Sequence, residues 1–122
     1  MERPLWTPSP SFKEDANLTL YQQWLNKQYN LSFATYHDLW NWSVNNIDEF
    51  WQTILAYFHV SYDGTIRDVR TGDTMENTIW FPGISLNYAE HIFKQESPTR
   101  PAIIFRNEAG MQKEIQWHQL RL

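Results

Sequence analysis

Apolar residues recur with helical spacing near the middle of the chain. From Ile47 to Phe58 they fall at positions i, i+3, i+4 and i+7 nearly without exception, and this is the strongest periodicity in the sequence. Asn46 precedes the pattern, and Glu49 follows three residues later, which is the spacing of a helix start. The pattern therefore predicts a helix that begins at Asn46 and ends near Phe58.

Two weaker helical patterns precede this one. Ser11 has a glutamate three residues later, as in a capping box, and the apolar face that follows predicts a helix as far as about Gln28. Thr35 has an aspartate at the same offset and predicts a helix of about ten residues. The first ten residues hold three of the six prolines, so we expect an extended arm whose Leu5 and Trp6 can dock on the rest of the protein.

Residues 61–78 contain the turn signals Asp63–Gly64 and Thr71–Asp73 and are expected to form turns. The short β-prone pieces Thr65–Ile66 and Asp68–Val69 predict at most a minor strand between the turns. Residues 80–83 read as a tight apolar turn, and Ser85 is expected to cap a helix that runs to about residue 94.

The last part of the chain changes to a β pattern. A short apolar run at Ala102–Phe105, a turn at Asn107–Gly110 and alternation over Lys113–Trp117 predict a hairpin. Residues 118–122 look like the first turn of a helix that the chain does not finish. Because a lone two-stranded hairpin is marginal in water, we expect further strands to complete it.

These elements predict the α+β class, with a mainly α-helical N-terminal cap followed by a β-hairpin. We expect an extended arm over residues 1–10, a helical domain over 11–97, and the truncated start of a further domain over 98–122. At 122 residues the chain is long enough for one small core.

The composition narrows the classes of function. The formal charge is −4 and no basic run interrupts the sequence, which argues against nucleic acid as a partner. The absence of cysteine excludes disulfides, thiolate catalysis and cysteine-ligated zinc, and it fits a reducing compartment. No signal peptide and no membrane-length apolar run occurs, so we expect a cytoplasmic protein without a membrane partner.

No residue forms a recognisable catalytic or metal-binding pattern. The histidines at His37, His59, His91 and His118 lack ligand-like spacing, so we predict no metal site. Asp48 is expected to complement the dipole at its helix start rather than to act as an acid or base.

The acids of residues 63–73 lack calcium-loop spacing and are expected to form local ion pairs with Arg67 and Arg70 in a solvated loop. There is no glycine-rich phosphate loop, so no cofactor-binding residue is predicted either. The tryptophan-rich faces admit two interpretations. They either pack in a core or stand exposed as a stacking surface for sugars or peptides, and we favour the core.

Three blocks of the sequence are rich in aromatic residues at fixed places, namely Tyr36–Val44, Phe50–Trp51 and Trp80–Glu90. Together they resemble the N-terminal region of acetyl-CoA-synthetase-type enzymes. The opening Pro4–Ser9 and the ending Asn87–Glu90 look more like the acetoacetyl-CoA synthetase branch of this family. In the same direction, Ile84 stands where acetyl-CoA synthetases usually have a second glycine. The hairpin from Pro101 to Trp117 is similar to the first hairpin of the large adenylation domain.

The resemblance implies an ATP-dependent acid–thiol ligase that forms acetoacetyl-CoA, AMP and pyrophosphate through an acyl-adenylate. Such an enzyme uses ATP, magnesium and coenzyme A, and its catalytic motifs lie downstream of the region that this chain resembles. No residue here matches a catalytic, cofactor-binding or metal position of the family, so the implied role is structural. The expected partner is the rest of the adenylation domain in cis, with self-association when that partner is missing.

Two alternatives to an inactive part of an enzyme stay open at this point. The chain would otherwise be a self-sufficient Trp-rich binding module, or an interaction adaptor that docks its strongest helix on another protein.

Overall fold

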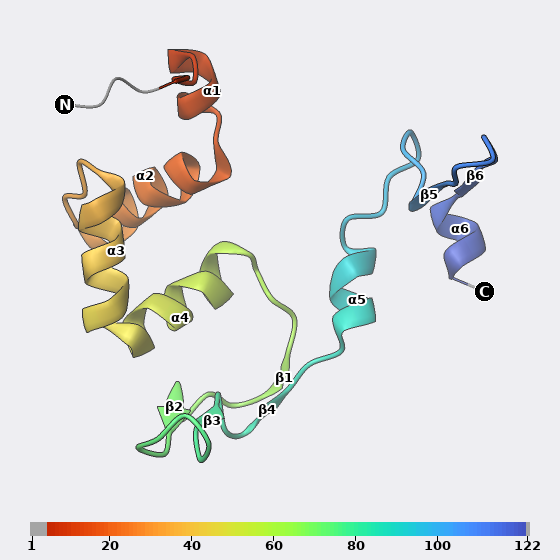
Figure 1. Cartoon of the computed structure of the whole chain (residues 1–122). Coiled ribbons are helices and arrows are strands. Elements are labelled where there is room, and N and C mark those ends of the chain that lie inside the picture. The colour runs from red at the N-terminus through yellow and green to blue at the C-terminus, as the bar shows by residue number, and fades with distance from the viewer. Residues whose placement is uncertain (1–4, 122) are drawn as a thin grey trace. The chain divides into compact units, whose positions relative to one another are not determined.

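The computed structural model describes residues 5–121 and confirms the α+β class (Figure 1). One compact unit holds the chain up to residue 60 together with residues 66–82, and a second holds residues 61–65 and 83–122. The helices are α1 (Pro10–Glu14), α2 (Asn17–Tyr29), α3 (Tyr36–Asn45), α4 (Ile47–Tyr57), α5 (Tyr88–Phe93) and α6 (Trp117–Leu120). Three antiparallel pairs join β1 (Asp63–Gly64) to β4 (Ile84–Ser85), β2 (Arg70–Thr71) to β3 (Ile79–Trp80), and β5 (Ile103–Arg106) to β6 (Gln112–Ile115).

The single helix predicted from Ser11 to about Gln28 is wrong, because two helices occupy this stretch. Pro10 opens α1, since its fixed φ suits the first helical position and its missing N–H is not needed there. The cap is therefore Ser9, whose hydroxyl accepts from the backbone N–H of Phe12 at 3.2 Å. The backbone at residue 16 is extended and separates α1 from α2. Of the predicted arm, residues 1–4 lie outside the described residues.

The cap predicted at the start of α3 is confirmed. The Thr35 hydroxyl accepts from the Asp38 backbone N–H at 3.3 Å, and the Asp38 carboxylate accepts from the Thr35 N–H at 2.8 Å. The same carboxylate accepts from the Thr35 hydroxyl and from the Ala34 N–H. These hydrogen bonds, led by that of the Thr35 side chain, lower the pKa of Asp38 from its ordinary value.

The helix predicted after Asn46 is confirmed as α4, but Asn46 does not cap it with its side chain. The Asn46 amide instead donates to the Trp42 carbonyl at 3.1 Å, and its backbone N–H donates to the same oxygen at 2.8 Å. Asn46 thus lies between α3 and α4. It donates to a carbonyl at the end of α3 that has no acceptor role within that helix.

The helical core is small and contains one polar pair. Tyr21, Leu25 and Leu39 are its buried apolar residues, and Thr53 is buried with them. The Tyr21 and Thr53 hydroxyls lie 2.6 Å apart, and Thr53 also donates to the Phe50 carbonyl at 2.7 Å. Because a threonine has a single hydroxyl proton, Tyr21 is the donor to Thr53. Burial raises the pKa of Tyr21.

The prediction that the aromatic faces pack in the core is correct only in part. Trp24, Phe33, Trp42, Phe50 and Tyr57 lie against the buried residues and are half-buried. In contrast, exposure reaches 48% for Trp40, 42% for Trp51 and 55% for Phe58. These three rings flank the core instead of filling it.

The stretch between α4 and α5 differs from the prediction. The strands are β1 and β2 rather than Thr65–Ile66 and Asp68–Val69, and their partners β3 and β4 were not predicted. Gly64 has φ of +98°, and a Cβ there would lie 2.2 Å from the Gly83 carbonyl oxygen, so the β1–β4 pair needs this glycine. Ser85 lies in β4 and does not cap α5. Asn87 does, by accepting from the Glu90 backbone N–H at 3.3 Å.

The predicted hairpin is confirmed as β5–β6, with Ile103 opposite Ile115 and Arg106 opposite Gln112. Its turn is held by the Asn107 side chain, which accepts from the Met111 backbone N–H at 2.9 Å. The helix expected at the end of the chain begins at Trp117. The Trp117 ring packs against Phe93 with 5.9 Å between ring centroids.

We expect Thr35→Ala to lower the free energy of unfolding by about 1 kcal/mol, because the change removes an N-cap hydroxyl. Thr35→Ser keeps the hydroxyl and should cost far less. A depressed folded-state pKa gives Asp38 a stabilising effect above its unfolded pKa, and this effect is lost as the pH falls. Thr35→Ala should therefore weaken the loss of stability as the pH falls below about 4, the ordinary pKa of an aspartate, and urea titrations at each pH would measure this.

We expect Thr53→Val to cost about 1–3 kcal/mol, because it leaves the buried Tyr21 hydroxyl without an acceptor. Tyr21→Phe combined with Thr53→Val should recover part of this loss, because neither polar group then remains. Urea denaturation of both single variants and the double variant gives the coupling energy. Strictly additive losses would show that the hydrogen bond does not couple the two residues.

Candidate functional site

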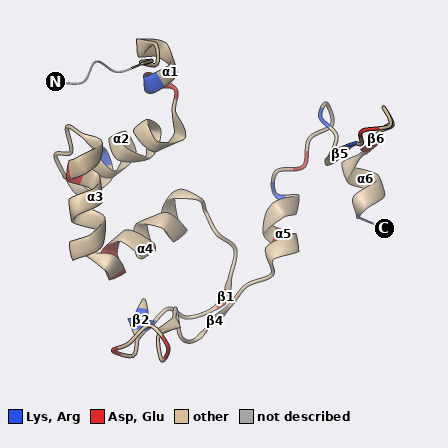
Figure 2. Cartoon of the chain, viewed as in Figure 1, with Lys and Arg blue, Asp and Glu red and all other residues tan. Residues whose placement is uncertain are grey.

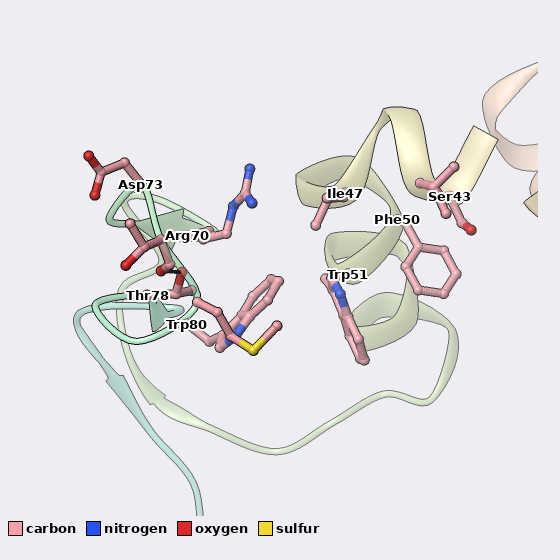
Figure 3. Close-up of a pocket in the computed structure, with 11 residues that line it drawn as sticks. Ser43, Ile47, Phe50, Trp51, Arg70, Asp73, Thr78 and Trp80 are labelled. Atoms are coloured by element: carbon pink, nitrogen blue, oxygen red, sulfur yellow. Dashed lines mark hydrogen bonds between the residues drawn. The ribbon is translucent and has the colours of Figure 1, made fainter. Parts of the chain in front are cut away.

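A hollow in the first unit lies between the α3–α4 pair and the β2–β3 ribbon (Figure 3). We call it the tryptophan groove, and its volume is about 510 Å³. That size is in the range of small-molecule sites, which bury apolar surface around a few polar groups. The lining residues are Ser43, Val44, Ile47, Phe50, Trp51, Arg70, Asp73, Thr74, Met75, Thr78 and Trp80.

Two indole rings meet across this groove. Trp51 from α4 and Trp80 from β3 have ring centroids 5.6 Å apart at an interplanar angle of 62°, which is the edge-to-face arrangement that aromatic quadrupoles favour. Phe50 stands beside Trp51 at 5.4 Å. Figure 3 shows the two indoles directed toward each other from opposite walls. Both remain more than two-fifths exposed, so each ring keeps surface for a further contact.

An ion pair joins the same two walls. The Arg70 Nε donates to Asp48 Oδ1 at 2.9 Å, and the Arg70 guanidinium carbon lies 6.0 Å from the centre of the Trp80 ring. Acidic residues at the start of α4 and a basic residue in β2 are visible in Figure 2. The partner of Arg70 is therefore on α4, and the expected pairing within the loop is wrong for this residue. Asp48 lies in the first turn of α4, as the sequence predicted.

The rim of the groove is a turn closed by Asn77. Its side-chain oxygen accepts from the backbone N–H groups of Asp73 at 3.0 Å and Thr74 at 2.9 Å. Its amide donates to the Asp73 carboxylate at 2.7 Å. That side-chain hydrogen bond is the main cause that lowers the pKa of Asp73. The carboxylate thus serves to hold the turn.

Within residues 5–121, no three histidine or acidic side chains lie close enough to hold a metal ion. The four histidines are spread over separate elements, with His37 beside the Tyr36 ring at 5.7 Å and His91 within α5. The prediction that the chain supplies no catalytic, cofactor-binding or metal-binding residue stays a prediction.

A second and more apolar hollow lies among α2, α3 and α4, and we call it the helix groove. Its volume is about 320 Å³. Its lining residues are Asn17, Leu18, Tyr21, Tyr36, Leu39, Trp40, Ser43, Phe50, Ile54 and Phe58. Neither groove was predicted from the sequence. The available signal was the tryptophan that recurs in the blocks at 36–44, 50–51 and 80–90, but it does not say which rings meet.

The second unit leaves two buried polar atoms without a partner. Neither the Trp117 indole nitrogen nor His91 Nδ1 makes a hydrogen bond within residues 5–121. Buried polar atoms of this kind are rare in native structures. On the hairpin, the three successive residues Ile103, Ile104 and Phe105 are each between 42% and 56% exposed. Since neighbouring strand residues point to opposite sides, both faces of β5 are apolar.

Comparison with known sequences supports the family resemblance seen in the sequence. The acetyl-coenzyme A synthetase N-terminus profile matches residues 36–92, which run from the start of α3 into α5. Over these residues the chain is similar to the acetyl-coenzyme A synthetase N-terminus. The resemblance found in the sequence is thereby confirmed, and the match includes Trp51 and Trp80 of the tryptophan groove.

Relatives extend this similarity to nearly the whole chain. Acetoacetyl-coenzyme A synthetase of Rhizobium meliloti is 29% identical over 120 residues, 98% of this chain and 18% of the relative. Acetoacetyl-CoA synthetase of Danio rerio is 29% identical over 110 residues, 86% of this chain and 16% of the relative. Malonamoyl-CoA synthetase of Penicillium aethiopicum is 28% identical over 127 residues, 98% of this chain and 17% of the relative.

This N-terminal region therefore spans less than a fifth of the length of the curated relatives it matches. No solved structure matches it. Among the described residues, no helix is both long enough and apolar enough to cross a membrane.

We expect Trp80→Ala to weaken the packing of the β2–β3 ribbon on α4 far more than Asp48→Asn does. The first change removes an aromatic contact, whereas the second removes an ion pair whose side chains are 36% and 50% exposed and which is worth less than about 1 kcal/mol. Trypsin cleavage after Arg67 and Arg70 measures the opening of the ribbon. The rate should rise about tenfold in Trp80→Ala and less than about threefold in Asp48→Asn. A larger increase in the cleavage rate for Asp48→Asn than for Trp80→Ala would show that the ion pair is the main contact between the ribbon and α4.

Proposed function

We propose that this chain is the N-terminal part of an ATP-dependent acid–thiol ligase. That ligase would convert acetoacetate, ATP and coenzyme A to acetoacetyl-CoA, AMP and pyrophosphate through an acyl-adenylate. The observation that carries the proposal is the family match over residues 36–92, together with similarity to proteins named acetoacetyl-CoA synthetase over 98% and 86% of the chain. A cysteine-free chain suits the reducing cytoplasm in which we place the ligase.

Within this ligase the region would be structural and inactive by itself. ATP, magnesium and coenzyme A would bind residues of the ligase outside these 122, because the sequence holds no phosphate loop and the described residues hold no cluster of metal ligands. Acetoacetate is favoured as the acid by the names of the bacterial and fish relatives. The fungal relative is named for a different acyl group, so the acid is the least constrained part of the proposal.

The partner of this region would be the remainder of the ligase. Support comes from β5, whose apolar residues face both sides of a strand that pairs only with β6 within residues 5–121. Strands with two apolar faces are typical of sheets that are covered on both sides. Further strands and a covering layer would bury Ile103, Ile104 and Phe105. When that partner is missing, we expect the same surface to cause self-association.

A chimera tests the proposal directly. Residues 1–122 would replace the matched segment of the Rhizobium meliloti acetoacetyl-CoA synthetase, and acetoacetate-dependent exchange of pyrophosphate with ATP would be measured. We expect exchange in the chimera and none in the isolated 122-residue chain, because the reacting groups belong to the remainder of the ligase. The relative without its own matched segment serves as the control and should be insoluble or inactive.

Exchange activity in the isolated chain would contradict the structural role. A truncated relative that keeps full activity and solubility would show that the region is dispensable. The alternative function, a Trp-rich binding module, is favoured by the exposed indoles of the tryptophan groove. It predicts saturable binding of a sugar or peptide by the isolated chain, lost in Trp51→Ala, and a flat titration against a ligand panel would remove it.

A further inference from the structure

The N-terminal arm holds two large apolar side chains in water. Trp6 is 72% exposed and Leu5 is fully exposed, and both precede the first cap at Ser9. Leu5 to Ser9 form no regular helix or strand. Burying such side chains against an apolar surface lowers the free energy of the protein in water.

One apolar surface that begins a short way along the chain is the helix groove. Its edge is formed by Asn17 and Leu18 at the start of α2, and its walls are mostly aromatic and aliphatic. Leu18, Trp40 and Phe58 are between 47% and 55% exposed there, so the groove is open. Its volume of about 320 Å³ is sufficient for a single large side chain with room to spare.

The arm is long enough to reach this groove. Between Trp6 and Asn17 lie three arm residues, the five residues of α1 and the two residues that join α1 to α2. Extended residues span up to about 3.3 Å each, and a helix about 1.5 Å per residue, so the tether reaches well beyond the groove edge. The backbone at Ala16 is extended, so the chain changes direction between α1 and α2.

The arm also suits burial against an apolar wall. Pro8 lacks a backbone N–H, so covering it leaves no unsatisfied donor. The Trp6 indole N–H needs one acceptor, and the groove offers the Asn17 side-chain carbonyl and the Ser43 hydroxyl. The Ser43 hydroxyl gives its own proton to the Trp40 carbonyl at 2.8 Å and is therefore free to accept.

We propose that residues 5–9 act as a strap that closes over the helix groove of the same chain, with Trp6 seated among Leu18, Trp40 and Phe58. The same chain is the favoured source of the strap because a short tether gives an effective concentration in the millimolar range. Closure covers the helix groove and leaves the tryptophan groove open. The inference does not rest on the proposed ligase function.

Cysteine trapping tests the strap, because the chain has no cysteine of its own. Thr7→Cys places a thiol beside Trp6, and Tyr36→Cys places its partner in the lining of the helix groove. The matched control pairs Thr7→Cys with Asn41→Cys, an exposed position on the same helix outside that lining. Disulfide formation in a glutathione buffer gives the effective concentration of each thiol pair, and the groove pair should exceed the control pair at least tenfold.

A third variant tests whether the Trp6 ring itself holds the arm in the helix groove, or whether the arm is merely close to it. Trp6→Ala in the Thr7→Cys and Tyr36→Cys chain should reduce the effective concentration to that of the control pair, whereas Trp6→Phe should keep most of it. Circular dichroism checks that each variant retains its helices. Equal trapping of the groove and control pairs, no effect of Trp6→Ala, or disulfides formed only between two copies would each overturn the proposal.

Discussion

The hydroxyl groups of Tyr21 and Thr53 meet inside the helical core, and the packing of α2 on α4 depends on this contact. Thr53 is the most buried residue of α4, at 2% exposure, although the helix is otherwise rich in large apolar groups. The Tyr21 ring packs edge-on against Tyr57 at 5.0 Å and Phe50 at 6.4 Å. A buried hydroxyl without a partner is costly, so the polar pair fixes the rotation of α4 that apolar bulk alone would leave free.

This rotation explains why the two grooves exist. Successive residues of a helix differ by about 100° around its axis, so Thr53 and Tyr57 point in nearly the same direction. The apolar stripe is centred well to one side of that direction, near Ile54 and Ile47. With Thr53 toward α2, one edge of the stripe joins the core, while Trp51 becomes a wall of the tryptophan groove and Phe58 a wall of the helix groove.

Local signals explain which elements the sequence could predict. Three features depend on residues close together in the sequence, and all three were predicted. They are the capping box of Thr35, the periodicity of α4 and the turn of the hairpin at Asn107. Asn46 was misread because its amide closes the preceding helix instead of capping the next one. The pairing of Asp63 with Ser85 spans 22 residues, the difference of the two positions, and no periodicity records it. The tryptophan groove was missed for the same reason, because Trp51 and Trp80 meet only through tertiary structure.

The exposed apolar groups form two classes that call for different explanations. Ile103, Ile104 and Phe105 follow one another on a strand, so no repacking of the hairpin with itself can cover both of its faces. Trp40 and Phe58 border a groove whose own chain carries free apolar groups within reach. The proposed remainder of the ligase would cover the first class, whereas the second can be covered by the described residues themselves. A surface rich in tryptophan is therefore not by itself evidence of a ligand site, because each exposed ring must first be compared with the chain segments able to cover it.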